Sequence, residues 1–497
     1  MNNILNIIKS NKLTFEQKVI ALGREAENSL NILKIDERTE YYRKLGIICD
    51  LFEGNAPYRP RYIVPDYELF MKNGSKFLGL EPATNIWEAT NNLLILYKHV
   101  PSITTMPVYV GNLDYLLEPY VKNEEEAYLA IKLFLKHIDS TITDSFCHGN
   151  IGPKETKAGL LILKAMEELQ LPTPNLTLKY NEETSEKIAI RAIETALVTA
   201  KPSFANDKMF RADFKGEYGI VSCYNGLKVG GGANTLVRIR LGKLSKSAKD
   251  KNDFLENILP EISKCVLDYI DERSKFIIEE SNFYETNFLV KEGLLDKEKF
   301  TGLFGIVGLA ECVNNLLKAE NKEDRYGYSQ KANDLGIEIV KKLEELVKNH
   351  KSNYAGSFFE NRHILHSQVG LDVDVQESPG CRIPVGEEPE IFEHIIQSAP
   401  FHKYFPSGIG DIFVFDETYK KNPQAILDII KGAFLNDMRF FSLYCTDCDV
   451  VRVTGYLVKK SEIAKLEKGE AVLRDTTILG KGARDNGKAL DRKLREE

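Results

Sequence analysis

Short apolar segments alternate with long amphipathic ones along most of this chain, and this alternation restricts the fold more than any other feature. Residues 174–180 (PNLTLKY) and 218–226 (YGIVSCYNG) have the length and pattern of β-strands. Residues 185–200, 254–280 and 327–350 carry apolar side chains at helical spacing. Strands separated by long helices predict an α/β fold with a largely parallel sheet or barrel.

The composition is that of a soluble globular protein, with 43% hydrophobic and 28% charged residues. A formal net charge of −7 gives no indication of nucleic acid or of an anionic membrane as a partner. Polar residues interrupt every apolar run of residues 1–18, so we expect neither a signal peptide nor a membrane span. We therefore expect a cytoplasmic protein whose eight cysteines are reduced thiols.

A glycine interrupts a strand-like segment near the C-terminal end, VRVTGYLV at residues 451–458. A glycine inside a strand usually marks a bulge or a close approach of the backbone. The pattern R-V-x-G-Y, however, resembles the motif of the glycyl radical enzymes, in which this glycine stores an unpaired electron. Only glycine lets the radical centre become planar without a clash at Cβ. The resemblance makes Gly455 the radical residue and Arg452, Val453 and Tyr456 the rest of the motif.

A second resemblance concerns residues 172–184 and 203–226, which are similar to the half-barrel of pyruvate formate-lyase that leads to its reactive cysteine. The shared features are a P-N-L-T strand, an N-D-x-M-x-R-x-D-F segment and a strand that ends in cysteine. On this match Cys223 is the thiyl residue, which passes the radical from Gly455 to the substrate. Cysteines 312, 381, 445 and 448 lie too close in sequence to Gly455 for this role.

The resemblance covers about residues 170–480, and the segments 300–317 and 445–463 are most similar to the YjjI-type glycyl radical enzymes. It implies a ten-stranded barrel of two five-stranded parallel half-barrels surrounded by helices, with the cysteine and glycine loops meeting inside. We expect a catalytic α/β barrel domain over residues 1–435 and a C-terminal glycine radical domain over residues 436–497.

Two residues beside Cys223 depart from the well-known branches of the superfamily. Pyruvate formate-lyase has a second cysteine where this chain has Ser222, a far poorer nucleophile. Diol dehydratases have a glutamate base where this chain has Asn225, which cannot take a proton. Neither acyl transfer nor simple diol dehydration is therefore well supported, and either needs a replacement group. The candidates for substrate contact or proton transfer are Asn225, Glu311, Cys312, Glu377 and Cys381, although cysteines at helical spacing are more often core residues.

Three further stretches admit more than one interpretation. The pair Cys445 and Cys448 (CTDC) is half of a zinc site, with His402 as a conceivable partner, or a redox-active dithiol, or two structural cysteines. We expect no bound metal, because the sequence contains no second C-x-x-C pair. The stretches 147–153 (CHGNIGP) and 359–368 (FENRHILHSQ) are candidates for lining a pocket, although histidines such as His363 and His366 are more often core or surface residues.

These motifs predict an oxygen-sensitive radical enzyme of the lyase or acyltransferase-like kind, which breaks a C–C or C–O bond in a small metabolite. The chain has no C-x₃-C-x₂-C iron–sulfur spacing, so it cannot make its own radical. We expect no bound cofactor, a separate radical-SAM activating enzyme that uses S-adenosylmethionine, and a homodimer. The alternatives are radical reduction of nucleotides, as in anaerobic ribonucleotide reductases, and a non-catalytic spare part for another radical enzyme.

Overall fold

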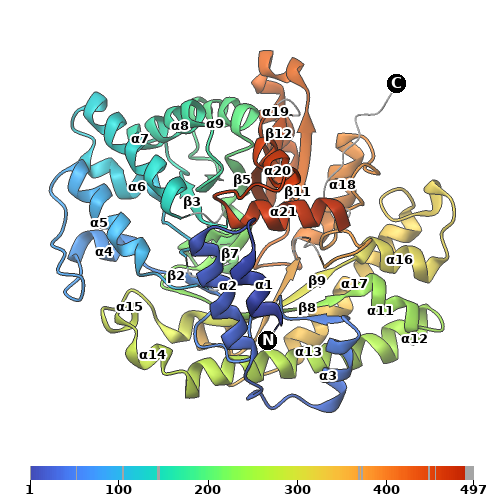
Figure 1. Cartoon of the computed structure of the whole chain (residues 1–497). Helices are drawn as coiled ribbons and strands as arrows, with labels where there is room; N and C mark the ends of the chain where they lie inside the picture. Colours follow the sequence, from blue (N-terminus) through green and yellow to red (C-terminus); the bar gives the residue numbers. More distant parts are fainter. Residues whose placement is uncertain are drawn as a thin grey trace.

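The computed structural model describes residues 2–51, 53–102, 106–142, 146–367, 370, 373–445, 448–453 and 455–486. Two five-stranded sheets form the centre, and helices surround them (Figure 1). The α/β fold predicted from the sequence is confirmed.

The first sheet has the order β11-β12-β5-β4-β3. Strands β3, β4 and β5 are parallel to one another, as are β11 and β12, while β12 runs antiparallel to β5. The antiparallel pair aligns Phe440 with Ala205, so it joins segments that lie far apart in the sequence. The strands are β3 (His148–Ile151), β4 (Asn175–Tyr180), β5 (Ser203–Asn206), β11 (Asp411–Phe415) and β12 (Phe440–Cys445).

The second sheet has the order β1-β8-β9-β10, and β2 also pairs with β8. Strands β8, β9 and β10 are parallel, whereas β1 and β2 run antiparallel to β8 and cover its other edge. The two five-stranded sheets agree with the prediction, but neither is wholly parallel, because N-terminal strands add to one and β12 joins the other in reverse. The strands are β1 (Ile48–Cys49), β2 (Tyr62–Val64), β8 (Gly231–Arg240), β9 (Phe300–Val307) and β10 (Ile364–Ser367).

Two antiparallel hairpins complete the β-structure in the described residues. The first consists of β6 (Tyr218–Val221) and β7 (Asn225–Lys228), and the second of β13 (Val450–Val453) and β14 (Tyr456–Lys459). All strand residues of both hairpins are buried except the last one of each. Both hairpins therefore lie inside the protein rather than on its surface.

Amphipathic helices cover the sheets, and side chains at their first turns satisfy the unpaired amides there. Ser185, for example, accepts the amide proton of Ile188 at the start of α9, which is typical of an N-cap. The predicted helices over 185–200, 254–280 and 327–350 are all found. The longer helices are α2 (Phe15–Asn28), α5 (Ile86–Lys98), α7 (Glu124–Thr141), α8 (Lys157–Leu169), α9 (Glu186–Thr199), α13 (Leu259–Lys275), α16 (Leu309–Leu317), α17 (Gln330–Asn349), α18 (Ile391–His402) and α19 (Pro423–Leu435). The shorter ones are α1 (Asn2–Lys9), α3 (Glu37–Lys44), α4 (Tyr67–Asn73), α6 (Leu113–Leu117), α10 (Asp207–Asp213), α11 (Leu241–Leu244), α12 (Lys251–Asp253), α14 (Phe283–Thr286), α15 (Phe288–Lys291), α20 (Lys460–Glu467) and α21 (Asp475–Asn486).

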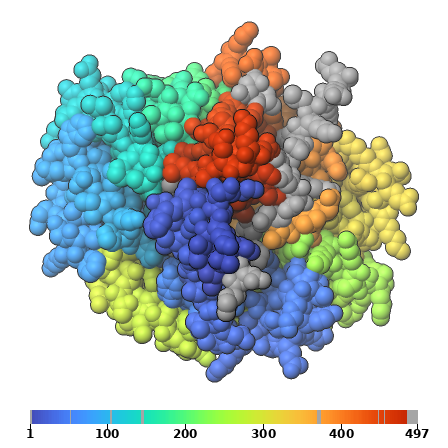
Figure 2. Space-filling view, viewed as in Figure 1, coloured from blue at the N-terminus to red at the C-terminus, as the bar shows by residue number. Residues whose placement is uncertain are grey.

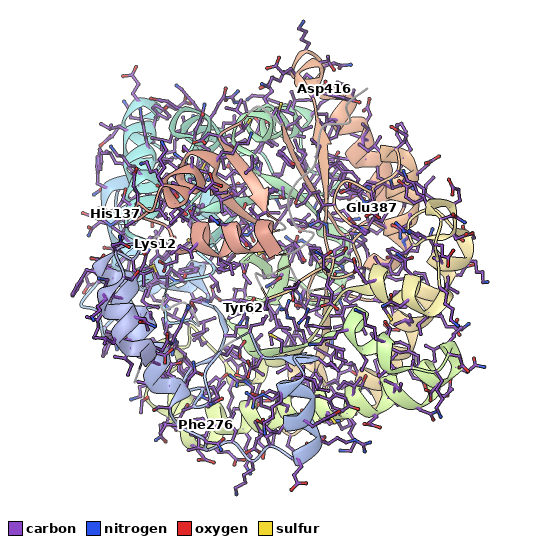
Figure 3. The ribbon with its side chains drawn as sticks, turned by 45° about the vertical axis from the view of Figure 1, so that its right-hand side comes forward. Lys12, Tyr62, His137, Phe276, Glu387 and Asp416 are labelled. Carbon is purple, nitrogen blue, oxygen red and sulfur yellow. The ribbon has the colours of Figure 1, made fainter. Side chains whose placement is uncertain are left out.

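The two ends of the described chain lie together. Helices α1 and α2 lie beside α20 and α21 in Figures 1 and 2, and Lys12 marks the turn between α1 and α2 in Figure 3. Gln17 in α2 donates a hydrogen bond to the carbonyl oxygen of Val472 at 3.0 Å. The N-terminal helices thus pack on the segment that follows the glycine hairpin.

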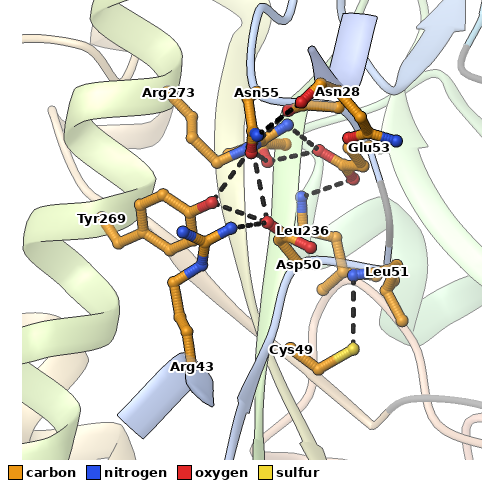
Figure 4. Close-up of polar contacts among 12 residues, drawn as sticks. Asn28, Arg43, Cys49, Asp50, Leu51, Glu53, Asn55, Leu236, Tyr269 and Arg273 are labelled. Carbon is orange, nitrogen blue, oxygen red and sulfur yellow. Dashed lines mark hydrogen bonds and ion pairs between the residues drawn. The ribbon is translucent and has the colours of Figure 1, made fainter. Parts of the chain in front are cut away.

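A buried arginine joins the N-terminal segment to α13 (Figure 4). Arg273 is fully buried and donates to the carbonyl oxygen of Gly54 at 2.9 Å, and it pairs with Glu53 at 3.3 Å. Tyr269, one turn earlier, donates to Asp50 at 2.6 Å. These contacts compensate the buried guanidinium, which would otherwise be costly.

The expected division between residues 435 and 436 stays a prediction. Strand β12, which follows that position, belongs to the first sheet, while the glycine hairpin and helices α20 and α21 come after it. The described part of the chain contains no helix that combines the length and the apolar character needed to cross a membrane.

Candidate active site

Cys223 lies at the tip of the β6–β7 hairpin. The last residue pair of this hairpin is Val221 with Asn225, which leaves three residues for the turn. Ser222 has a φ of 57°, a conformation that L-residues adopt mainly in tight turns, and its hydroxyl lies 3.8 Å from the Cys223 sulfur. Only 2% of Cys223 is exposed. The hairpin therefore presents this thiol to the interior of the protein.

Side chains of β3 and β4 hold the edge of β6 that β7 does not pair with. Side chains alternate along a strand, so residues two apart on β3 or β4 face the same side. The backbone carbonyls two apart on β6 accept hydrogen bonds from them in register. The pairs are His148 Nδ1 with Ser222 at 2.8 Å, Asn150 Nδ2 with Ile220 at 2.9 Å, and Lys179 Nζ with Tyr218 at 2.7 Å.

The contacts of His148 define its protonation. Because the Ser222 carbonyl can only accept, His148 Nδ1 carries the hydrogen and the other ring nitrogen accepts from the Thr177 hydroxyl at 2.8 Å. Burial lowers the pKa of His148 to about 3, so the ring is neutral around neutral pH. His148 is thus a fixed donor to the residue before Cys223.

Gly455 lies in the turn of the β13–β14 hairpin, next to the terminal pair of Val453 with Tyr456. The residue is buried. Its carbonyl oxygen accepts hydrogen bonds from Asn175 Nδ2 and from Arg452 Nη1, each at 3.3 Å. Thr454, the x of the motif, is outside the described residues.

The two hairpins meet in one buried apolar cluster. This cluster contains Cys223 and Tyr224 from the first hairpin together with Val453 and Tyr456 from the second. Burial lowers the pKa of Arg452 to about 9, and the nearby Cys223 thiol opposes this shift, so the two side chains lie within electrostatic range. The structure therefore places the two hairpins that carry Cys223 and Gly455 in the same buried cluster.

The other side of the cysteine hairpin rests on the last residue of β10 and on the loop that precedes β11. Tyr224 donates its hydroxyl to the carbonyl oxygen of Ser367 at 2.7 Å, and the Gly226 amide donates to that of Ser407 at 2.6 Å. His366 lies beside the Tyr224 ring, with 6.1 Å between the centroids. Both sheets thus contribute to the position of Cys223.

Asn225 lies directly after the turn and is buried. Its side-chain oxygen has no hydrogen-bond partner within the described part of the chain. Because a buried polar atom usually has a partner, this oxygen is a candidate contact for a substrate.

Two other candidates for substrate contact, Glu311 and Glu377, bind groups in or next to the loop that contains Ser378. The Glu311 carboxylate accepts from the backbone amide and hydroxyl of Ser378, and Glu377 pairs with Arg240 at 2.5 Å. Cys312 is fully buried and packs in a different apolar cluster from Cys223, and burial raises its pKa. Glu311 and Glu377 therefore stabilise the loop that contains Ser378, and Cys312 is a residue of an apolar core.

Cys381 packs in the same cluster as Cys312, and burial raises its pKa well above the usual range. Its charge state also affects the pKa of Tyr224, next to Cys223. Of the three candidates Glu311, Cys312 and Cys381, it is the one that the structure links to the cysteine hairpin.

Both cysteines of the CTDC stretch are buried, and the Cys448 sulfur lies 3.1 Å from the carbonyl oxygen of Leu197. The two residues between them are outside the described residues. No disulfide joins any two of the eight cysteines, all of which the structure describes. His402 Nδ1 accepts the amide proton of Arg439 at 2.9 Å, and the ring faces Asp411.

The stretch that contains His148 was a predicted pocket segment, whereas Asn175, Thr177 and Lys179 had no predicted role. The signal that could have found them is the alternation of polar residues in NLTLK, which places 175, 177 and 179 on one face of a strand. His363, by contrast, pairs with Asp271 at 2.8 Å in a different region from the cysteine hairpin.

A glycine hairpin and a cysteine hairpin that share one buried cluster, in an α/β fold with two five-stranded sheets, are the features expected of a glycyl radical enzyme. The family model described as "Glycyl radical enzyme YjjI-like" matches residues 13–495. The chain belongs to this family. Enzymes of this class carry a protein-based radical that a partner activase generally installs.

Two relatives support this assignment over their whole lengths. A protein of Haemophilus influenzae, named only "Uncharacterized protein", is 47% identical over 504 residues, which cover 100% of this chain and 98% of the relative. The "Uncharacterized protein YjjI" of Escherichia coli is 42% identical over 496 residues, which cover 98% and 95%.

Solved structures show the same fold at low identity. The B12-independent glycerol dehydratase of Clostridium butyricum has a TM-score of 0.69 at 11% identity, with 92% of this chain and 86% of that chain covered. The anaerobic ribonucleotide reductase of Thermotoga maritima, solved with glycerol in the active site, has a TM-score of 0.69 at 12% identity, with 87% and 85% covered. Since these enzymes carry out different reactions, the shared fold does not identify the reaction of this one.

Proposed function

We propose that Gly455 stores the radical and that Cys223, as a thiyl radical, abstracts a hydrogen atom from a small metabolite. The observation that carries this proposal is that the Cys223 and Gly455 hairpins meet in one buried cluster. A hydrogen atom can move between two residues only when they approach each other, and a water-excluded site protects the radical while it does.

The cycle balances without an external oxidant. The S–H bond of Cys223 breaks and a C–H bond forms at the Gly455 Cα, which leaves a thiyl radical. That radical takes a hydrogen atom from a C–H bond of the substrate and regenerates the S–H bond. After the substrate radical has rearranged or fragmented, it takes the hydrogen atom back, and the glycyl radical is restored in the reverse of the first step.

The side chains around Cys223 favour cleavage of a C–C or C–O bond in a small polar metabolite. Ser222 gives no second thiol for acyl transfer, and Asn225 gives no base at the position that dehydratases use. The buried polar groups include the Asn225 oxygen, partnerless among the described residues, and, on β5 and β12, the hydroxyls of Ser203 and Ser442, which lie 2.9 Å apart. These groups suit a ligand that carries hydroxyl or carbonyl oxygens.

Activation requires a second protein in this proposal. A radical-SAM activase removes a hydrogen atom from Gly455 with S-adenosylmethionine, and it recognises Arg452, Val453 and Tyr456. Because these residues are buried, the glycine hairpin must become accessible before the activase can act. We further propose that the enzyme is a homodimer and works in an oxygen-free cytoplasm.

The test is anaerobic incubation with the activase, a reductant and S-adenosylmethionine, followed by EPR spectroscopy and a screen of small polyols, 2-oxo acids and sugars. The wild type should show a doublet from the Gly455 α-hydrogen, and Gly455→Ala should show none. Cys223→Ser should keep the doublet and turn over no substrate. Cys312→Ser is the matched control, because Cys312 is buried in another cluster, and it should keep both properties. A radical in Gly455→Ala, or turnover by Cys223→Ser, would contradict the assignment.

A further inference from the structure

The carbonyl group of Gly455 has two side-chain donors from different parts of the chain. Asn175 projects from β4 of the first sheet, and Arg452 projects from the glycine hairpin itself. Both donate to the Gly455 oxygen at 3.3 Å, and Arg452 Nη2 also donates to Asn175 Oδ1 at 3.3 Å. The three groups thus form a closed triangle of hydrogen bonds.

The network also defines which way the Asn175 amide points. Its oxygen accepts from the backbone amide of Leu176 at 2.9 Å as well as from Arg452. Since both of these neighbours can only donate, the oxygen faces them and the NH₂ group faces the Gly455 carbonyl. Asn175 is fully buried, so no water competes for this donor.

Arg452 is a buried cation whose hydrogen bonds to the described residues end in this triangle. Only 2% of the residue is exposed, and within the described ranges no carboxylate forms an ion pair with it. Burial lowers its pKa to about 9, so the guanidinium remains charged at neutral pH. A buried charge without a counter-ion is expensive, and its field in a low-dielectric interior acts strongly on the nearest polar group. Here that group is the Gly455 carbonyl.

A glycyl radical shares its unpaired electron between the amide nitrogen, Cα and the carbonyl group. This delocalisation moves electron density onto the carbonyl oxygen, so the radical gains more than the closed-shell glycine from donors placed there. Donors already in position cost no reorganisation when the charge develops. The arrangement resembles an oxyanion hole, with a backbone radical in place of a tetrahedral intermediate.

We propose that Asn175 and Arg452 stabilise the radical state of Gly455 by hydrogen bonding to its carbonyl oxygen. A hydrogen atom moves between Gly455 and Cys223 in an equilibrium. The two donors shift this equilibrium toward the side on which Gly455 holds the radical and Cys223 keeps its S–H bond. This inference rests on the proposed function, and it assigns both residues to the control of where the radical resides.

The first experiment needs no substitution. The activated wild-type enzyme in deuterated solvent, studied by electron–nuclear double resonance, should show exchangeable deuterons coupled to the glycyl radical in addition to those of the adjoining backbone amides, as expected for N–H donors at the carbonyl oxygen. A glycyl radical without any such coupling would overturn the inference. Absence of a glycyl radical altogether would instead overturn the proposed function on which it rests.

The second experiment compares Asn175→Leu and Arg452→Met with Asn234→Leu. Asn234 is a matched control, because it is also buried and accepts a hydrogen bond from Tyr284 at 2.7 Å, but in the second sheet. In Asn175→Leu and Arg452→Met, the EPR splitting from the Gly455 α-hydrogen should be larger than in the wild type. An added thiol should also quench the radical about tenfold faster, which is the factor expected for the loss of one charge-assisted hydrogen bond. Arg452→Lys, which keeps the charge, should lie between them and the wild type. Wild-type splitting and lifetime in Asn175→Leu and Arg452→Met would refute the role, and so would equal changes in Asn234→Leu.

Discussion

His148 Nδ1 lies 2.8 Å from the carbonyl oxygen of Ser222, the residue that precedes Cys223. Together with Asn150 and Lys179, this histidine replaces the neighbouring strand that β6 lacks on that edge. The position of the thiol therefore depends on side chains of β3 and β4 as well as on the hairpin turn.

Replacement of His148 by leucine should reduce turnover about tenfold or more without reducing the glycyl radical signal. The variant loses the donor to Ser222, so Cys223 no longer sits at a fixed place, and small misplacements are costly in catalysis. His148→Asn, whose amide can donate from nearly the same position, should recover most of the activity. Turnover and EPR intensity on the same samples check this expectation. Equal loss in the leucine and asparagine variants would show that the donor is not what matters.

The free energy of unfolding should decrease in mild acid because of His148. The pKa of His148 is about 3 in the folded protein and 6.5 for an unperturbed histidine, so the unfolded chain binds more protons between these limits. Stability therefore rises with pH through that window, and it falls as the pH drops below about 6.5, by about 1.4 kcal/mol per pH unit from this group. Urea unfolding at about pH 5 and about pH 7 measures the slope. His148→Asn should show a smaller slope, and an unchanged slope would contradict the assignment.

Exposure of the activated enzyme to air should cut the chain at Gly455. A backbone radical reacts with O₂ to give a peroxyl species that breaks the chain at that residue. The 42 residues that follow Gly455 in the sequence form a fragment of about 5 kDa. Mass spectrometry of the fragments locates the break, and protein that was never activated serves as the control. Intact chain after exposure of an EPR-positive sample would rule out Gly455 as the radical residue.

Arg474→Met should loosen helices α20 and α21. Arg474 forms buried ion pairs with Asp139 on α7 and Glu462 on α20, and the substitution leaves both carboxylates buried without their partner. Removing one member of a buried pair typically costs about 3–5 kcal/mol. Hydrogen exchange over residues 460–482 should become faster. Lys264→Met, which removes an exposed ion pair with Asp268, is the control and should change little.

The sequence alone predicted the long helices over 185–200, 254–280 and 327–350 and the strands within 174–180 and 218–226, because periodicity is a local property. Its choice of Gly455 and Cys223 as the reactive residues rests on short motifs and stays a prediction. It did not predict that β12 runs antiparallel to β5, since that pairing joins segments far apart in the chain. Arg452 had only the role of a motif residue in that prediction. Its contact with Asn175 exists only once the glycine hairpin has packed against β4, and no spacing within either segment records it.

The candidates Glu311, Cys312 and Cys381 illustrate a second limit of prediction from sequence. Each carries a chemically suitable group, and nothing in the sequence separates a framework residue from a site residue. The structure does so through partners, because Ser378 occupies the Glu311 carboxylate and Cys312 packs in another cluster. Residue type predicts what a group is able to do, whereas three-dimensional contacts determine whether it is available.

The hydrogen bond from Gln17 to Val472 bears on the order in which the molecule is made. A ribosome releases Gln17 long before Val472, so α1 and α2 cannot reach their final positions until residue 472 has been added. The glycine hairpin belongs to the same late segment, so a nascent chain holds Cys223 without Gly455 while the next 232 residues (455 − 223) are added. Docking of the first helices and completion of the reactive pair therefore both wait for residues 455–472, more than two hundred residues after Cys223 has been added.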